Sequence, residues 1–316
     1  MSYQRLIGIV LMLTYLLIIV GGATRVFDAG VSCPDWPHCY GHLVPFPESA
    51  IPGGYVVSGQ HFEWWQVALE WSHRTIASIV SVGMLAILVI AVRKRRAMPL
   101  EKAPLIAAIF FLLVQIGLGG LTVLKANIDW SVVLHLGTAM LFFASLTWLR
   151  RAVASGGQQE PVAAPLITRL VVYAFAFVVW STMLVGAFVS SSHSGGVCGG
   201  LFSCAGQWAP VDLQQHMHMQ HRFMALTTAV LSIILLILAK RTAPRLRASA
   251  LHGHAMVWGQ VILGVATLYS FADYPDYYPI LSIAHLAWGT LVWLAAVGII
   301  LNLHYGQHGR FHDRQH

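Results

Sequence analysis

The amino-acid sequence predicts an all-α integral membrane protein whose eight transmembrane helices form two parallel-repeat four-helix bundles. Composition and the length of the apolar runs predict membrane insertion. The 316 residues are 57% hydrophobic and only 10% charged, and their mean hydropathy is +0.68. Such a chain has too few charges to cover a soluble globule and too many apolar runs to bury them in one core. A third observation, an internal duplication, predicts the two bundles.

Eight apolar runs reach the length of about 20 residues that a spanning helix needs. The first run is long enough to span, and no cleavage site of small residues follows it. We therefore expect it to be a helix rather than a cleaved signal peptide. The predicted helices cover residues 6–24, 67–92, 104–124, 131–149, 170–190, 215–239, 251–270 and 280–301.

The basic residues predict how these helices are oriented. The net charge of +7 and the isoelectric point near 9.4 would suit nucleic acid, but in a membrane protein the positions of Lys and Arg matter more. We expect no nucleic-acid partner. One set of connections holds fifteen of the nineteen, which predicts that both termini are cytoplasmic: Arg5, Arg93, Lys94, Arg95, Arg96, Lys102, Arg150, Arg151, Arg169, Lys240, Arg241, Arg245, Arg247, Arg310 and Arg314. The outer side has only Arg25, Arg74, Lys125 and Arg222.

The four cysteines form two pairs in predicted outer loops. These loops cover residues 25–66, 125–130, 191–214 and 271–279. Five residues separate Cys33 from Cys39, and five separate Cys198 from Cys204. On the oxidising side of a membrane a disulfide is the default interpretation. The competing interpretation is a thiol pair that takes part in redox chemistry or in transient substrate capture.

The second half of the chain repeats the pattern of the first. Both cysteines of the first pair have counterparts in the second pair at one constant offset, and Gln115 has its counterpart in Gln260. Because each half carries four helices, both halves enter the membrane in the same direction, which predicts a pseudo-twofold axis along the membrane normal. The predicted domains are residues 1–151, a flexible cytoplasmic linker at 152–169, and residues 170–316.

Four histidines at the outer ends of predicted helices are the main candidates for a functional site. His73 is followed by His135 at nearly the same spacing at which His221 is followed by His285. An ionisable residue inside a spanning helix is expensive and usually faces the interior of the bundle. Four-helix bundles hold haem iron between imidazoles on facing helices, so each pair is a candidate for the two iron ligands of one haem. Room for a flat macrocycle is offered by Gly117, Gly119, Gly120 and Gly264.

Other interpretations of these residues stay open at this stage. Each histidine could be a polar residue hydrogen-bonded across helices, and the glycines could serve close helix packing. Zinc is a weaker alternative, because a closed structural site requires four ligands and each half offers two at this depth.

The two halves differ one turn before the first histidine of each pair. Glu70 precedes His73 by three residues, whereas the residue three before His221 is His218. A carboxylate beside an iron site can move protons or stabilise a developing cation, so Glu70 is the candidate catalytic residue. It should point towards the haem held by His73. The alternative is that Glu70 is a structural partner of Arg74 or Arg222.

These motifs together resemble the haem A synthase family. The resemblance rests on Glu70-x-x-His73-Arg74, His135, His221-Arg222, His285, and Cys33-Pro-Asp-Trp-Pro-His-Cys39, and it covers nearly the whole chain. It implies a membrane enzyme that oxidises the C8 methyl group of haem O to a formyl group, giving haem A for terminal oxidases. In the family the amino-terminal histidine pair is associated with the substrate haem and the carboxy-terminal pair with haem b. The family's acidic residue before the third histidine is replaced here by His218.

The resemblance also implies partners and a location. Haem O is the expected substrate, haem A the product and haem b the cofactor, with haem O synthase and an electron acceptor or donor as candidate partners. The expected location is the bacterial inner membrane, where a homo-oligomer is one candidate state. The rival function is a dihaem b-type electron carrier linked to quinol, without chemistry on haem. A transporter ranks third, since no Gly/Pro-broken helix pair stands out.

Overall fold

The computed structural model describes residues 2–44, 47, 49, 51–93, 99–124, 128–156 and 158–306. Within them it forms eight long α-helices, each long and apolar enough to cross a membrane, which confirms the predicted fold class. The helices are α1 (Tyr3–Val26), α2 (Trp64–Arg93), α3 (Pro99–Leu124), α4 (Asp129–Ala154), α5 (Leu166–Ser191), α6 (Leu213–Thr242), α7 (Arg247–Asp273) and α8 (Tyr278–Tyr305). The short elements are β1 (Val56–Val57), β2 (Gln60–His61), η2 (Ser194–Gly196), η3 (Pro244–Leu246) and η4 (Pro275–Tyr277).

Each helix extends beyond its predicted apolar run, and in α1 and α6 a capping side chain accounts for the earlier start. The Asp212 side chain accepts a hydrogen bond from Gln215 N at 3.0 Å, which fixes the start of α6. Between the halves, α4 continues to Ala154 and α5 begins at Leu166. The connection is therefore shorter than the predicted linker at 152–169.

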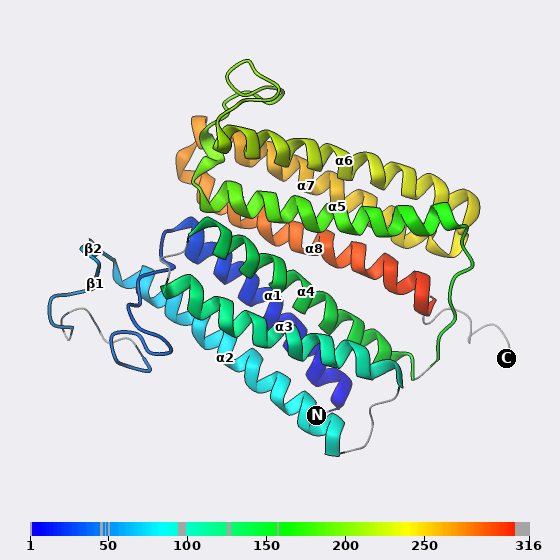
Figure 1. Cartoon of the computed structure of the whole chain (residues 1–316), viewed down its shortest axis with the longest axis horizontal. Coiled ribbons are helices and arrows are strands. Elements are labelled where there is room, and N and C mark those ends of the chain that lie inside the picture. Colours follow the sequence, from blue (N-terminus) through cyan, green and yellow to red (C-terminus); the bar gives the residue numbers. More distant parts are fainter. Residues whose placement is uncertain are drawn as a thin grey trace.

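The helices lie in two neighbouring groups that share a central seam (Figure 1). Helices α1–α4 form one group and α5–α8 the other. A long loop that contains β1 and β2 joins α1 to α2, and a second long loop that contains η2 joins α5 to α6. Contacts between the groups run from α1 and α4 to α5 and α8. This seam also contains a buried apolar core that includes Met140, Phe143 and Ala296.

Two hydrogen bonds cross the seam in matching positions. Tyr15 Oη donates to the carbonyl of Ala287 at 3.2 Å, and Trp180 Nε1 donates to the carbonyl of Gly137 at 3.1 Å. Tyr15 corresponds to Trp180 at the offset that relates the two cysteine pairs, and Gly137 corresponds to Ala287 at the offset that relates His135 to His285. Such a pair of contacts is what two repeats around a twofold axis would make, while the repeat and the domain limits stay predictions.

Arg25 joins the two groups at the outer end of α1. Its Nη2 donates to the carbonyls of Ser190 and Ser191 at 2.9 and 2.5 Å, and its Nη1 donates to Asp28 at 2.8 Å. The guanidinium therefore supplies donors and positive charge to the last carbonyls of α5, where a helix favours a cation.

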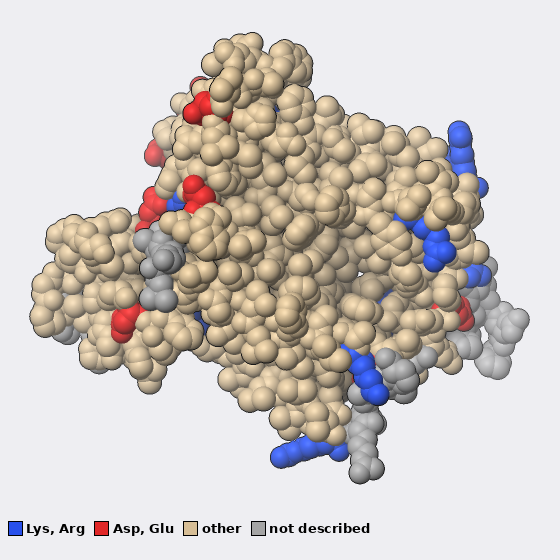
Figure 2. Space-filling model, in the orientation of Figure 1, with Lys and Arg blue, Asp and Glu red and all other residues tan. Residues whose placement is uncertain are grey.

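The charged side chains separate along the helix direction. Figure 2 shows Lys and Arg mainly at one end of the helices and most Asp and Glu at the other. This distribution agrees with the predicted orientation, which stays a prediction. Several of the basic residues used to predict it lie outside the described residues: Lys94, Arg95, Arg96, Lys125, Arg310 and Arg314.

Candidate functional site

His73 of α2 and His135 of α4 form the first pair. Each ring lies against a glycine of a neighbouring helix. A Cβ added to Gly21 of α1 would lie 2.8 Å from Cε1 of His73, so only glycine permits this approach. His135 lies against Gly119 of α3, at 3.6 Å from an added Cβ. The two rings lie within electrostatic range of each other. Nδ1 of both His73 and His135 is buried without a hydrogen-bond partner.

The second pair repeats this arrangement between α6 and α8. A Cβ added to Gly186 of α5 would lie 2.8 Å from Cε1 of His221, the same distance as in the first half. A Cβ added to Gly264 of α7 would lie 3.0 Å from Cε1 of His285. The ring centroids of His221 and His285 are 6.3 Å apart, with an interplanar angle of 80°. The rings of His221 and His285 are therefore in contact, and His73 and His135 lie within electrostatic range of each other.

The second pair could hold a haem iron between its two rings. Two imidazoles whose nitrogens each lie about 2.0 Å from one metal ion between them have ring centroids roughly 6 Å apart. His221 Nδ1 lies 3.1 Å from the carbonyl of Thr182, a bond that would leave Nε2 as the metal ligand. The Nδ1 atom of His285 is buried without a partner. Two neutral imidazoles suit iron, whose remaining ligands a porphyrin supplies.

An apolar cavity of about 430 Å³ lies between α1, α7 and α8. It lies within the size range of small-molecule sites, and Ala284 and Ala287 flank His285 in the sequence. Its walls come from α1, α7 and α8 and consist of Tyr15, Gly259, Leu263, Ala284, Ala287, Trp288 and Leu291.

Glutamine side chains at corresponding positions contact the second histidine of each pair differently. Gln115 Nε2 donates to the carbonyl of His135 at 2.8 Å and also contacts Thr138 Oγ1. Gln260 Nε2 lies 3.2 Å from Nε2 of His285, while its Oε1 is buried without a partner. Gln115 therefore binds the backbone of α4, whereas Gln260 contacts Nε2 of His285, the ring nitrogen that would ligate a metal.

Glu70 is buried, with 4% of its surface exposed, and its carboxylate is held by three donors. Oε2 accepts hydrogen bonds from Ser32 Oγ at 2.9 Å and from the backbone N of Cys33 at 2.8 Å. Oε1 accepts from Arg74 Nη2 at 2.6 Å. These bonds direct the carboxylate towards the outer loop, so the contacts show the structural partnership with Arg74 that was the alternative interpretation.

Arg74 clamps the first cysteine loop onto α2. Its Nη1 donates to the carbonyls of Asp35 and His38 at 2.5 and 2.6 Å, and its Nη2 donates to the carbonyl of Cys33 at 3.2 Å. Bonds from one guanidinium to several carbonyls fix the loop in one position above the helix.

Arg222 clamps the second cysteine loop without a carboxylate. It donates to the carbonyls of Leu201 and Cys198 at 3.0 Å each, and also to that of Gly200. His218, in the position that corresponds to Glu70, is 7% exposed and its Nδ1 has no hydrogen-bond partner. An arginine therefore holds each cysteine loop. The residue one turn earlier is Glu70 in the first half and His218 in the second.

Both predicted disulfides are present. Cys33 is bonded to Cys39 and Cys198 to Cys204, with Cα atoms 4.7 and 4.6 Å apart. All four cysteines are buried.

Comparison with known proteins agrees with this arrangement. A family model described as cytochrome oxidase assembly protein matches residues 4–297. The chain belongs to this family. Its similarity to haem A synthase of Shewanella oneidensis is 29% identity over 302 residues, covering 85% of this chain and 88% of that protein. Haem A synthase of Shouchella clausii is 27% identical over 281 residues, covering 84% and 86%. The predicted membership of the haem A synthase family is confirmed.

The sequence did not predict several residues that lie around the site of this member of the haem A synthase family. Asp35 Oδ1 and Tyr40 Oη are buried in the first cysteine loop without hydrogen-bond partners. Burial, followed by the charges of Glu70, Tyr55 and Asp35, raises the pKa of Tyr40 to about 12. Their position beside Cys33 and Cys39 was the signal available in the sequence. Thr182 acts through its backbone carbonyl, for which no side-chain motif exists.

Proposed function

We propose that this protein is a haem A synthase, an oxidoreductase that converts the C8 methyl group of haem O to a formyl group. The observation that carries the proposal is the pair of facing imidazoles repeated at the outer ends of α2 and α4 and of α6 and α8. The family membership and the names of the similar proteins support it. The same proposal locates the chain in a bacterial cell membrane with both termini cytoplasmic.

The two histidine pairs have different roles in this proposal. His73 and His135 hold the substrate haem O, and His221 and His285 hold haem b. When bound, haem b supplies a one-electron redox centre beside the substrate. The glycines under each ring keep the imidazoles in place, and the Thr182 carbonyl orients His221 so that Nε2 faces the iron.

Conversion of a methyl group to a formyl group, written with water as the oxygen source, releases four electrons to a separate electron acceptor and four protons. Because these protons require an acceptor, Glu70 is the proposed catalytic residue. Its carboxylate can take up a proton, or stabilise a cation that forms on the methyl carbon. The three donors that hold it would also keep it in one position. Apolar helix faces and lipid would accommodate the farnesyl tail of haem O.

The proposal is tested by producing the protein in a bacterial host that makes haem O but no haem A, then extracting and chromatographing the pigments. We expect haem A to appear only when the protein is present, and the purified protein to contain haem b. Membranes that keep all their haem O, with haem b alone in the purified protein, would overturn the proposal and favour the electron carrier.

A further inference from the structure

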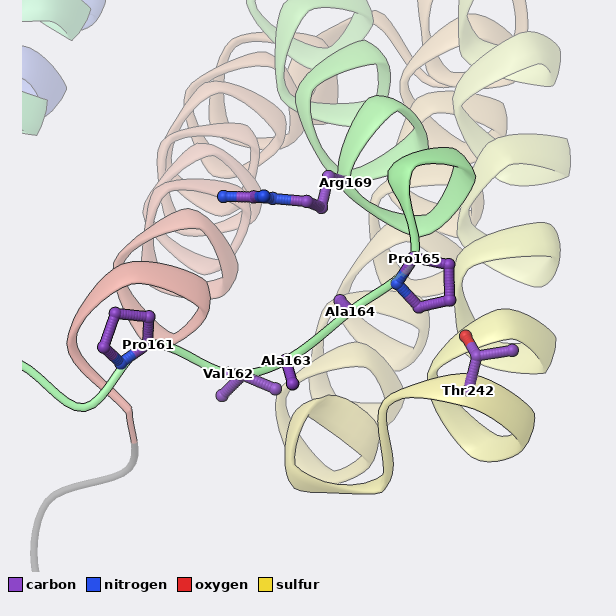
Figure 3. Close-up of a pocket in the computed structure, with 7 residues that line it drawn as sticks. All are labelled: Pro161, Val162, Ala163, Ala164, Pro165, Arg169 and Thr242. Carbon is purple, nitrogen blue, oxygen red and sulfur yellow. The ribbon is translucent and has the colours of Figure 1, made fainter.

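A second cavity lies at the end of the helices opposite the histidine pairs, where the chain passes from one half to the other (Figure 3). Its volume is about 580 Å³. The segment 161–165 forms one wall, and Arg169 of α5 and Thr242 of α6 complete it. None of these residues takes part in the proposed reaction.

The walls of this cavity are held by specific contacts. Val162 N donates to the carbonyl of Leu303 at 2.9 Å, and the Val162 side chain is buried, which fixes the connecting segment on α8. The hydroxyls of Thr168 and Thr242 lie 2.9 Å apart and join the start of α5 to the end of α6. The cavity is thus bordered by α5, by α6 and by a segment that is anchored to α8.

The electrostatics of the cavity favour an anion. Arg169 is exposed, and among the described residues it forms no ion pair. It lies in the first turn of α5, where a cation opposes the helix dipole, and this turn has neither an acidic residue nor a side-chain cap at Pro165. An anion in the cavity would offset the Arg169 charge and would also meet the free N–H groups of α5.

Other basic residues extend the positive field. Helix α6 ends with Lys240 and Arg241, and Arg245 and Arg247 follow directly. Exposed Glu160 directly precedes Pro161 at one edge of the cavity, whereas the sequence contains no Asp or Glu at positions 161–211 or 213–272. Basic pockets between transmembrane helices are typical sites for anionic lipid headgroups.

Beside the cavity, α5 presents an apolar surface. Leu166, Ile167 and Leu170 are 71%, 56% and 53% exposed, and they belong to the same first turns as Arg169. A charged pocket next to exposed leucine and isoleucine matches a molecule with an anionic head and apolar chains, whereas a free phosphate would use only the pocket.

We propose that this cavity binds the phosphate headgroup of an anionic phospholipid, whose acyl chains lie along the exposed side of α5. The simpler interpretation is that Arg169 only extends to the membrane surface, as a basic residue at the end of a spanning helix commonly does. On that interpretation, Arg169 contributes no more to the preference for anionic lipids than any other basic residue at this end of the helices.

Native mass spectrometry of the purified protein would test the proposal, with dioleoyl phosphatidylglycerol and dioleoyl phosphatidylcholine offered at equal concentration. We expect retention of phosphatidylglycerol and little phosphatidylcholine. Arg169→Gln should lower the affinity for phosphatidylglycerol about fivefold, which corresponds to the loss of one basic contact. Arg169→Lys, which keeps the charge, should retain most of the binding. Arg150→Gln, a matched loss of charge at the same end of α4, should have little effect.

Equal retention of both lipids, or equal losses in the Arg169→Gln and Arg150→Gln proteins, would overturn the proposal. Inorganic phosphate that stabilises the protein against heating as strongly as phosphatidylglycerol would assign the site to a free anion and also overturn it. If Arg169→Gln does not yield folded protein, Arg169→Lys and the wild type still decide the question. Failure here leaves haem A formation untouched, because the cavity lies at the opposite end of the helices.

Discussion

The two cysteine loops of this protein are each held by an arginine, but the residue beside that arginine differs between the two halves. In each, an arginine directly after the first histidine of a pair donates to carbonyls of a disulfide loop. Arg222 does so beside His218, whereas Arg74 also binds the buried Glu70. Because the second loop is held without a carboxylate, loop closure alone does not require Glu70. The difference therefore teaches that this chain keeps a carboxylate beside the arginine only in the first half, where we propose the chemistry.

The largest expected effect separates the two haem sites. His221→Ala or His285→Ala removes one of two proposed iron ligands, so each should abolish or distort a low-spin b-type absorption spectrum while the first site still binds haem. Absorption spectroscopy of the purified variants measures this, with His254→Ala as the matched control on α7. An unchanged b-type spectrum in both variants would contradict the assignment of the second pair.

Glu70→Gln should lower the rate of haem A formation about 100-fold, the low end of what a proton-transferring group contributes. The amide keeps the size of Glu70 and one accepting oxygen for Ser32 and Cys33, whereas its NH2 group cannot accept from Arg74. Both haems should still bind, and haem O or a hydroxylated intermediate should accumulate. Chromatography of extracted pigments over time gives the rate.

His218→Gln is the matched change in the second half and should leave that rate within about threefold. Wild-type haem A formation by the Glu70→Gln enzyme would leave Glu70 only the structural role that its contacts show.

The glycines beneath the histidines offer a smaller, paired test. Gly21→Ala places a Cβ 2.8 Å from His73, and Gly186→Ala does the same to His221, so each ring must shift. Loss of ligand orientation should weaken haem binding about tenfold at the affected site only. Haem titration followed by absorption would report each site. Gly298→Ala, where an added Cβ meets nothing within 4 Å, is the control. Equal weakening at both sites in either variant would show that the sites are not independent.

The smallest effect is expected from the two glutamines. Gln115→Ala removes hydrogen bonds to α4 and should lower the free energy of unfolding by about 1 kcal/mol. Gln260→Ala should change the free energy of unfolding of the haem-loaded protein by less than about 0.5 kcal/mol, because His285 Nε2 would then bind iron. Thermal unfolding of both variants with haem bound makes the comparison. A larger loss from Gln260→Ala would contradict the proposed use of that nitrogen.

The helices and the histidine pairs could be predicted because their signals are local or repeated. An apolar run of spanning length specifies a membrane helix whatever surrounds it, and duplication in the sequence identified His73 and His221 as equivalent. The helix ends could not be predicted, since α6 starts where Asp212 caps it rather than where hydropathy rises.

The surroundings of Glu70 were also outside what the sequence indicates. Its partners Ser32 and Cys33 lie far earlier in the chain, in a loop whose path depends on the disulfide and on Arg74. Sequence spacing placed Glu70 on the same helix face as His73, but it could not show that the carboxylate turns towards the loop. The Thr182 carbonyl left no trace in the sequence, because every residue has one.

Arg25 has a consequence for the order in which the protein is made. On the predicted orientation its charge must cross the membrane with the first helix, while its acceptors at Ser190 and Ser191 belong to the fifth helix and have not yet been synthesised. Spanning helices insert first and associate afterwards. Until α5 arrives, the translocated guanidinium can therefore bind only Asp28 and water at the membrane surface, so the nascent amino-terminal half reaches its final form only after α5 has emerged from the ribosome.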